Sequence, residues 1–258
     1  MSDVYQHFRP EEKEFIDQVI AWQEDVDRTY APKLTDFLDP REQYILRSMV
    51  GVQNEIKYQL FGGTDRSERK RALLFPEYYQ PTIEDFQIGL YEMNYPKKFV
   101  QLDHRMILGS IMSLGIKREK FGDIIIHEDR IQFLSDLAME DYILVHLQQI
   151  GKAKVSISNQ DLAAILSSEE QWKEKETSMS SLRLDTLTST AFQISRNKAQ
   201  LVIQQGRAKV NWGIIDQTSF ECALGDVISV RGLGRCTLLE ILGTTKKDKL
   251  RVKLGVLK

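Results

Sequence analysis

The order of apolar and polar residues divides the chain into three predicted domains and one connector. In residues 1 to 80, apolar residues recur at helical spacing in EEKEFIDQVIAWQEDV and LDPREQYILRSMV, and Asp39 offers a cap for the second helix. Two extended runs follow around Gly62 and Gly63 in NEIKYQLFGGTDRSERKRALLFPEYY. This pattern predicts an N-terminal domain of two helices and one β-hairpin.

Residues 81 to 160 alternate between strand and helix patterns. IEDFQIGLYEM, GDIIIHED, RIQFLSD and KAKVSISN are typical of strands, whereas DHRMILGSIMSLG, with Asp103 as cap and Gly115 as stop, and MEDYILVHLQQIG are typical of helices. The order βαββαβ is that of ferredoxin-like and RNA-recognition folds. The strand at residues 124 to 126 is aliphatic and lacks the basic, glycine and aromatic signature of base-stacking modules. We therefore do not expect this domain to stack bases in a sequence-specific manner.

Residues 161 to 181 are predicted to form a connector, because SSEEQWKEKETSMSS is polar and has no periodic apolar face. One short strand is expected within it, around residues 172 to 177. The last predicted domain spans residues 182 to 258. There LRLDTLTSTAF indicates a short helix, and Ser195 caps a second amphipathic helix that ends at Gly206.

The second helix of this C-terminal domain carries positive charge where a purely structural helix would carry acids. Its first amides and the positive end of its dipole attract a phosphate, and Arg196 and Lys198 lie in that first turn. After Gly206, RAKVNW alternates outward and inward residues, so a basic strand starts from the same corner. A glycine-rich bend in VRGLGR lets the backbone approach a ligand closely. The pattern predicts a phosphate-binding corner that includes Arg183, Arg196, Lys198, Arg207, Lys209, Arg231 and Arg235.

Charge is distributed unevenly along the chain, whose net charge is −2. From Arg183 to the end there are 13 Lys and Arg residues against 6 Asp and Glu residues, so a cationic C-terminal third follows an acidic body. This asymmetry favours a polyanionic partner, although a solubilising surface is the alternative.

The composition indicates a folded protein of a reducing compartment. With 258 residues, 42% of them hydrophobic, the chain can bury a real core, and two cysteines are too few for a disulfide framework or a zinc site. The four histidines lack the spacing of metal ligands. Neither a secretion signal nor an apolar run of membrane-spanning length is present. We expect a cytoplasmic protein without membrane contact, metal or cofactor.

Basic residues also cluster in the first two predicted domains. Around the first helix of the central domain they define a secondary basic surface made of Lys97, Lys98, Lys117, Arg118 and Lys120. The residues after this helix offset its dipole, which is one explanation, and a shared phosphate-facing surface is the other. Near the hairpin tip we expect a solvated edge guarded by Arg66, Arg69, Lys70 and Arg71.

The C-terminal motifs RLDTL, SRNKAQLVIQQGRAKVNW and GDVISVRGLGR resemble the S4 RNA-binding domain over residues 182 to 258. The resemblance implies that the Ser-Arg helix start and the basic strand form an RNA surface. It adds Ser195, Asn197 and Asn211 to the residues expected to bind RNA. S4 domains usually continue this strand as Val-Asn-Gly, whereas this chain has Val-Asn-Trp-Gly starting at Val210.

A resemblance along nearly the full chain extends to the YlmH family of bacterial S4-domain proteins. It is carried by GGTDRSERKRALLFP, by YPKKFVQLDHRMILGSIMSLGIKREKFGDI and by the Val-Asn-Trp variant. The resemblance implies an α+β fold with an N-terminal domain, a central RNA-recognition-like domain and a C-terminal S4 domain. It further implies binding to the ribosomal RNA of large subunits that carry stalled peptidyl-tRNA, with possible contact to that tRNA, in ribosome-associated quality control. Genes of the family lie in cell-division loci.

Two rival functions follow from the same motifs. The Arg-Leu-Asp triplet at Arg183 is also a catalytic motif of pseudouridine synthases, but their β-rich catalytic domain usually follows the S4 domain, and no room for it remains before residue 258. A tyrosyl-tRNA synthetase would need a His-x-Gly-His signature, which is absent. We therefore predict a monomeric, non-enzymatic RNA-binding factor. The alternative is an adaptor that contacts a division or ribosomal protein and uses the S4 domain as an RNA tether.

Overall fold

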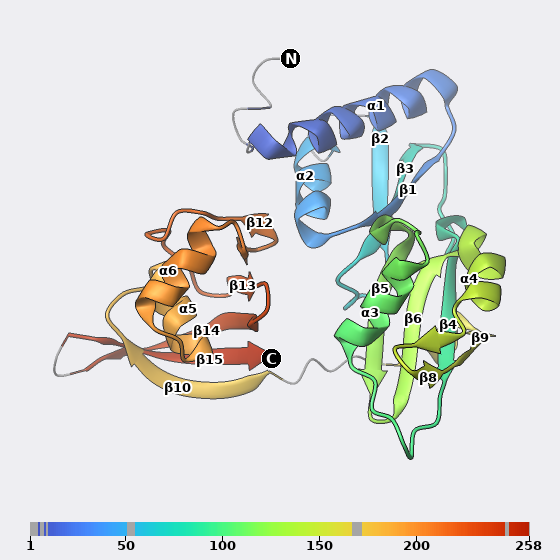
Figure 1. Ribbon diagram of the computed structural model, residues 1–258. Helices are drawn as coiled ribbons and strands as arrows, with labels where there is room; N and C mark the ends of the chain where they lie inside the picture. Colours follow the sequence, from blue (N-terminus) through green and yellow to red (C-terminus); the bar gives the residue numbers. More distant parts are fainter. Residues whose placement is uncertain are drawn as a thin grey trace. The chain divides into compact units, whose positions relative to one another are not determined.

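The computed structural model describes Tyr5, Phe8 and residues 10 to 50, 55 to 166, 172 to 245 and 248 to 257. It separates into two compact units, residues 1 to 168 and residues 169 to 258. The first unit contains the N-terminal and central domains together, and the second contains the C-terminal domain (Figure 1). No helix among the described residues combines the length and the apolar character needed to cross a bilayer.

The N-terminal domain is a three-stranded antiparallel sheet with two helices packed on it (Figure 1). The predicted helices are α1 (Lys13–Thr29) and α2 (Pro40–Val50), and the predicted hairpin is formed by β2 (Ile56–Phe61) and β3 (Lys70–Pro76). The sequence pattern missed strand β1 (Lys33–Leu38), which pairs with the other edge of β3. A polar residue of β1, Thr35, is buried, so the strand shows no clean alternation of apolar and polar residues.

Helix α2 begins at the predicted cap. The Asp39 carboxylate accepts hydrogen bonds from the amides of Arg41 and Glu42, both at 2.9 Å. In return the Glu42 carboxylate accepts the Asp39 amide at 2.6 Å. This reciprocal capping box fixes the helix start, and Pro40 at the first helical position requires no amide donor there.

The central domain confirms the predicted βαββαβ order. Its elements are β4 (Ile88–Asn94), α3 (His104–Ser113), β5 (Phe121–His127), β6 (Arg130–Asp136), α4 (Glu140–His146) and β9 (Ser156–Gln160). The sheet order β5-β6-β4-β9, with all neighbours antiparallel, is that of a ferredoxin-like fold. Between α4 and β9 the chain forms a small ribbon of β7 (Gln149–Ile150) and β8 (Ala153–Lys154). Asp103 caps α3 as predicted, accepting the Met106 amide at 2.8 Å.

The two faces of the central sheet are both buried. On one face, Tyr91 and Phe133 pack against α3 and α4. On the other, Leu90 and Leu134 pack in one cluster with Phe37 and other apolar residues of the N-terminal sheet, and residues 162 to 166 join the same cluster. RNA-recognition domains stack bases on this second face. Here the N-terminal domain covers this second face, so bases cannot stack on it. The sequence prediction rested only on the aliphatic strand at residues 124 to 126.

Buried polar contacts join the two sheets. Arg71 is 4% exposed; its guanidinium lies 3.2 Å from the Asp136 carboxylate and donates to the carbonyl of Thr35 at 2.8 Å. The Asp123 carboxylate accepts the amides of Glu68 and Arg69 at 2.7 and 3.0 Å. The prediction that Arg69 and Arg71 lie on a solvated edge is therefore wrong. Arg71 is buried, and the Arg69 guanidinium donates to the carbonyls of Phe121 and Phe37.

The C-terminal unit is a six-stranded sheet with two helices on one face. Its helices are α5 (Leu184–Phe192) and α6 (Arg196–Gln204), and its strands are β10 (Lys173–Met179), β11 (Ala208–Val210), β12 (Gly213–Ile214), β13 (Val227–Val230), β14 (Gly234–Thr244) and β15 (Leu250–Leu257). The strand order is β10-β15-β14-β13-β11-β12.

The segment predicted as a connector is divided between the two units. The strand expected around residues 172 to 177 exists as β10, but it pairs along its whole length with β15 and so belongs to the C-terminal sheet. Residues 162 to 166 pack on the central domain. Residues 167 to 171 lie outside the described residues.

Candidate nucleic-acid interface

The start of helix α6 has the predicted cationic character. The Ser195 hydroxyl accepts the Lys198 amide at 3.3 Å, and the first turn contains no acidic residue. Arg196, Asn197 and Lys198 are all exposed there. The N-terminal end of a helix already carries a partial positive charge, so these side chains concentrate positive potential there. Helix stability alone would favour acidic residues at these positions.

A buried carboxylate, that of Asp185 in the first turn of α5, lies under this helix start. Its oxygens accept hydrogen bonds from the Arg183 guanidinium at 3.2 and 3.3 Å and from the Arg196 guanidinium at 3.1 and 3.3 Å. The Gln200 amide donates to the same carboxylate at 3.0 Å. One buried anion thus holds two guanidinium groups from the beginnings of two helices.

Both arginines remain accessible while they bind Asp185. The side chain of Arg183 is 35% exposed and that of Arg196 is 50% exposed, whereas that of Asp185 is fully buried. Each guanidinium has five N–H donors, so the bonds to Asp185 leave donors facing outward. We name the helix-start cluster the group made of Arg183 and Arg196, of Asp185 and Gln200 beneath these two arginines, and of exposed Lys198 in the same first turn of α6 as Arg196.

The charge state of Asp185 is set by its partners. Burial by itself would raise the pKa of the carboxyl, but the hydrogen bonds from Arg183, Gln200 and Arg196 outweigh it and hold the pKa far below its usual range. Asp185 is therefore an anion at neutral pH. Sequence patterns alone do not reveal this role of Asp185, because its contacts with Arg196 and Gln200 span 11 and 15 residues.

The predicted basic strand lies on a different surface from the helix-start cluster. Lys209 pairs with Ser229, which pairs with Arg235, so these three residues share one face of neighbouring strands. Their neighbours Ala208 and Val210 turn to the opposite face, into the core shared with α5 and α6. The expected single corner is therefore wrong: Lys209 and Arg235 point away from the helices.

Arg207 and Arg231 meet at the end of this strand pair. The Arg231 amide donates to the Arg207 carbonyl at 2.9 Å, and the Arg207 guanidinium donates to the Arg231 carbonyl at 3.0 Å. Both side chains are exposed. The four basic residues Arg207, Lys209, Arg231 and Arg235 form a second group, which we name the strand cluster.

Asn211 has a structural role that the sequence prediction did not give it. It forms a two-residue turn with Trp212 between β11 and β12, with φ of 47° and 65°, both in the left-handed region. Its side-chain amide donates to the Asp226 carboxylate at 2.7 Å, and its side-chain carbonyl accepts the Val227 amide at 2.9 Å. These bonds join the turn to the start of β13, and Asn211 itself is exposed.

The predicted secondary basic surface is not a single surface. Arg118 donates to the carbonyl of Phe121 at 2.6 Å, and burial lowers its pKa to about 10. Lys120 binds the carboxylates of Asp36 at 2.6 Å and Asp136 at 3.0 Å, which ties the two domains of the first unit together. Arg118 and Lys120 are thus structural.

The other three residues of that group are exposed. Lys97 forms an ion pair with Asp129 at 3.4 Å. Lys98 and Lys117 lie on the surface at opposite ends of the α3 region.

The cysteines are not poised for chemistry. Cys222 and Cys236 are both buried and free. Burial raises the pKa of Cys222 to about 12, and burial likewise raises that of Cys236, so both thiols stay protonated at neutral pH. Among the described residues, no group of three or more His, Cys, Asp or Glu side chains is arranged to hold a metal ion.

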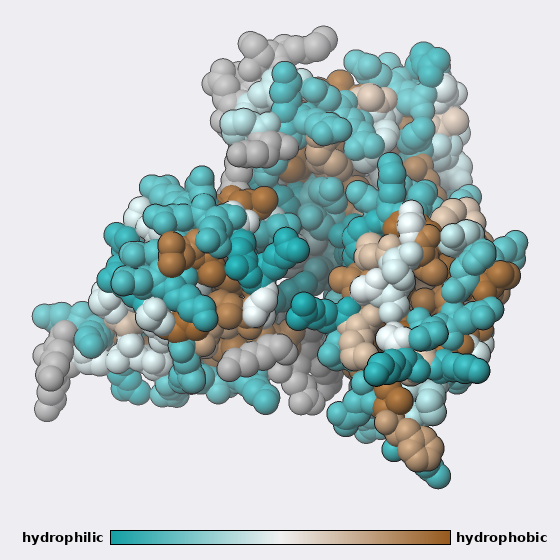
Figure 2. All heavy atoms as spheres, viewed as in Figure 1, coloured by the Kyte–Doolittle hydropathy of each residue, from teal (hydrophilic) through white to brown (hydrophobic). Residues whose placement is uncertain are grey.

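Figure 2 shows that hydrophilic residues cover most of the visible face of the C-terminal unit, with hydrophobic residues in small areas only. A helix pair with a cationic start, packed on a sheet that contains a basic strand, defines the class: an S4-type RNA-binding unit attached to a ferredoxin-like domain.

Comparisons with known proteins agree with this class. Residues 182–228 match the family model "S4 domain", and residues 81–164 match the model "Putative RNA-binding domain in YlmH". A Bacillus subtilis (strain 168) protein named "Ribosome-associated protein quality control protein P2" is 45% identical over 252 residues, which cover 98% of each chain. The chain belongs to the YlmH family of S4-domain proteins, as its motifs indicated.

A solved structure gives a further match. It is the "Cell division protein ylmH from Streptococcus pneumoniae", 34% identical, with a TM-score of 0.55. The match covers 63% of this chain and 99% of that chain. The family therefore includes proteins named for two processes, ribosome quality control and cell division.

Proposed function

We propose that the protein is a non-enzymatic factor that binds structured ribosomal RNA of the large subunit in ribosome-associated quality control. The observation that carries the proposal is the helix-start cluster, in which buried Asp185 holds the exposed guanidinium groups of Arg183 and Arg196. The name of the Bacillus subtilis relative supports the ribosomal setting, and with it a place in the cytoplasm.

The helix-start cluster suits the phosphates of an RNA backbone. Each arginine binds Asp185 through one edge and offers its remaining N–H groups to a ligand, which is the geometry that recognises phosphate. Exposed Lys198 adds a third positive charge in the first turn of α6, two residues after Arg196. Contacts of this kind position a protein on RNA without reading bases.

The structure of the first unit also favours recognition of RNA by its shape. The sheet face that would stack single-stranded bases is buried under the N-terminal domain. Folded RNA helices are recognised mainly through backbone and shape, so a structured segment is the expected target. Large subunits that carry stalled peptidyl-tRNA would present such segments in both ribosomal RNA and tRNA.

The absence of catalysis is supported by the state of Asp185. In pseudouridine synthases the aspartate of the Arg-Leu-Asp motif attacks substrate, which requires a free carboxylate oxygen. Here both oxygens of Asp185 accept hydrogen bonds and the carboxylate is fully buried. We therefore assign it a positioning role.

Sedimentation through a sucrose gradient tests the proposal. The wild-type protein should travel with large ribosomal subunits, and the variant Arg183→Glu/Arg196→Glu should remain at the top of the gradient. Arg47→Glu/Lys57→Glu, which reverses two exposed charges in the first unit, is the matched control and should sediment like the wild type. Retention of the Arg183→Glu/Arg196→Glu variant on subunits would contradict the proposal.

A second candidate function is a protein-interaction adaptor with the S4 domain as RNA tether. The name of the Streptococcus pneumoniae structure favours it. Purification before and after nuclease treatment separates the two. An adaptor keeps its protein partner when the RNA is digested, whereas an RNA-binding factor loses its complex.

A further inference from the structure

The face of the C-terminal sheet that lies opposite α5 and α6 carries a row of side chains across five strands. A chain neighbour of each member belongs to the core shared with the two helices, so the members themselves face the other way. Lys209 pairs with Ile214 and Ser229, Ser229 pairs with Arg235, and Arg235 pairs with Leu257. We name these five residues the sheet-face row.

An indole lies beside the Leu257 end of this row. Lys173 pairs with Val256, so Trp172 comes next to Leu257 at the following position. A Cβ added to Gly255, on the same face of β15, would lie 3.1 and 3.2 Å from Cβ and Cε3 of Trp172. Glycine is unfavourable inside a strand, and here the close approach of the indole to the backbone explains it.

Trp172 covers the sheet on one side and stays partly accessible on the other. Thr237 pairs with Gly255 on this face and is only 6% exposed, although no helix covers it from that side. The Trp172 side chain itself is half-buried. An aromatic ring is thus held against the backbone while part of its surface still faces outward.

The charged members of the sheet-face row, Lys209 and Arg235, are both positive. The nearest acids, on the edge strand β10, already have partners on β15. Glu174 binds Lys253 at 2.6 Å, and Glu176 lies 3.5 Å from the guanidinium of Arg251. The row therefore combines positive charge with an aromatic ring.

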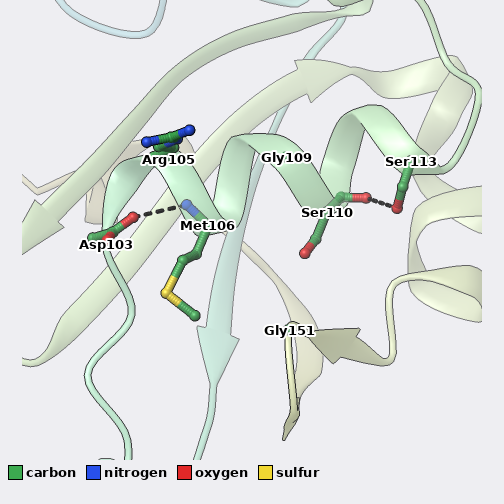
Figure 3. A pocket seen from close by; sticks show the side chains of 7 residues that line it. All are labelled: Asp103, Arg105, Met106, Gly109, Ser110, Ser113 and Gly151. Atoms are coloured by element: carbon green, nitrogen blue, oxygen red, sulfur yellow. Dashed lines mark hydrogen bonds between the residues drawn. The ribbon is translucent and has the colours of Figure 1, made fainter. Parts of the chain in front are cut away.

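The shallow groove beside α3 in the first unit lacks this combination (Figure 3). Its lining consists of Asp103, Arg105, Met106, Gly109, Ser110, Ser113 and Gly151. The charges of Asp103 and Arg105 cancel, and the lining includes no aromatic ring. The groove consequently favours no particular ligand.

We propose that the sheet-face row and Trp172 form a site for single-stranded RNA, in which an unpaired nucleobase stacks on Trp172 and phosphates bind Arg235 and Lys209. An aromatic ring beside a cationic track suits single strands, because every base has a π face. Arg235 and Lys209 are two strand spacings apart, about 10 Å, so one short segment can reach both. The inference rests on the proposed function in taking RNA as the partner.

This site is distinct from the helix-start cluster, which lies at the beginnings of the two helices. The C-terminal unit would bind the backbone of folded RNA there and an unpaired segment on the opposite face of its sheet. Loops of a folded RNA provide such segments. The two cations alone would also suit an acidic peptide, but the indole beside them favours a ligand that has both planar rings and phosphates.

Two substitutions of Trp172 separate stacking from apolar cover. The probe is a labelled uridine oligonucleotide of about ten nucleotides, bound to the full chain and followed by fluorescence anisotropy. Trp172→Leu keeps an apolar side chain over Gly255 but removes the π face, and it should lower affinity about tenfold. Trp172→Phe keeps a smaller ring and should lower affinity about threefold or less. Melting temperatures verify that both variants fold.

Equal affinities of Trp172→Leu and Trp172→Phe for the oligonucleotide overturn the proposal, because a purely structural role would not distinguish a ring from an aliphatic side chain. The matched control is Phe99→Leu, which removes an aromatic side chain that is 86% exposed in the first unit. It should leave the affinity unchanged.

Charge reversal tests the phosphate contacts. Lys209→Glu/Arg235→Glu should weaken oligonucleotide binding about tenfold and reduce the slope of log affinity against log salt by about 1.4, or about 0.7 for each lost contact with a single strand. Arg47→Glu/Lys57→Glu is the control. An unchanged slope in Lys209→Glu/Arg235→Glu overturns the proposal. Polyglutamate should displace the oligonucleotide poorly, and displacement as good as that by unlabelled RNA overturns it in favour of an acidic peptide.

The variant Arg183→Glu/Arg196→Glu distinguishes the two sites. It should lose refolded large-subunit ribosomal RNA but keep its affinity for the oligonucleotide, which needs only the sheet face. Wild-type binding of ribosomal RNA without binding of the oligonucleotide refutes the sheet-face site alone. Failure of the wild type to bind either RNA refutes the proposed function as well.

Discussion

At the scale of single residues, the arrangement around Asp185 decides how the C-terminal unit presents its charge. Two exposed arginines are long and flexible, and each would lose considerable side-chain freedom on binding a ligand. Asp185 fixes both before any ligand arrives, through hydrogen bonds of 3.1 to 3.3 Å. Pre-organisation of this kind raises affinity by reducing the entropy lost on binding.

The variant Asp185→Asn is expected to weaken RNA binding by about tenfold or more. An asparagine keeps the shape, but it removes the charge and directs two N–H donors at the guanidinium groups of Arg183 and Arg196. The C-terminal unit should also lose about 2 kcal/mol of stability with these charge-assisted bonds. Filter binding and chemical denaturation measure the two effects. Asp216→Asn, at an exposed acid of the same unit, is the control; wild-type affinity in Asp185→Asn would refute the positioning role.

The stabilisation from Asp185 should depend on pH. Its pKa in the folded protein lies far below its usual range. The ion pairs therefore stabilise fully above the unfolded pKa of about 3.9, and this contribution is lost as pH falls below that value toward the folded pKa. The difference in unfolding free energy between wild type and Asp185→Asn should thus shrink when pH is lowered from about 7 to about 2.5. A difference that stays constant over this range would be inconsistent with the assignment.

At the scale of elements, the local signals of the sequence were reliable where they were strong. The caps at Asp39, Asp103 and Ser195 start the helices that were predicted from them. Strands β1 and β10 are harder to recognise. Thr35 in β1 is polar yet buried, and KEKETSM in β10 has charged side chains because it is an edge strand.

The turn at Asn211 and Trp212 is the element that departs most from the expected pattern. A left-handed conformation is tolerated by asparagine but is costly for a bulky residue such as tryptophan. The side-chain bonds of Asn211 to Asp226 and Val227 help to fix this conformation. The sequence could not predict these bonds, since they join positions 15 and 16 residues apart.

Substitution of Asn211 is expected to affect stability more than binding. Asn211→Ala loses both side-chain hydrogen bonds and strains a backbone with φ of 47°, which together should cost about 2 kcal/mol. Asn211→Gly keeps the backbone conformation accessible and should cost about 1 kcal/mol. Urea unfolding gives both values. Each folded variant should bind RNA like the wild type, whereas a large loss of affinity at unchanged stability would show that Asn211 contacts RNA, as the sequence predicts.

At the scale of the whole molecule, the N-terminal and central domains behave as one unit because they share a core and a buried ionic network. The sequence predicted most elements of each domain but not that the two domains pack together. Periodicity shows that a face is apolar, but it does not show what covers that face. The same limit explains Arg71 and Lys120. In the sequence these two residues resemble charged surface residues. Their partners Asp136 and Asp36 lie on other elements, so the ion pairs cannot be inferred from local spacing.

Removal of Arg71 tests this union. Arg71→Ala leaves the carbonyl of Thr35 without its donor and removes one partner of buried Asp136, which should destabilise the first unit by about 3 to 5 kcal/mol. Hydrogen exchange should show lost protection in both sheets together. Arg28→Ala removes an exposed ion pair and should change little. Loss of protection confined to the N-terminal sheet would show that the two domains unfold separately.

We propose that the C-terminal unit binds RNA through phosphate contacts made by its clustered cations. The dependence of affinity on salt measures this directly, with refolded large-subunit ribosomal RNA and the full chain. Although the net charge of the protein is only −2, log affinity should fall against log salt with a slope of about −4 or steeper. Arg183→Glu/Arg196→Glu should make that slope shallower by about 2. A flat response in the wild type, or the same slope in both proteins, would show that these cations do not make the phosphate contacts.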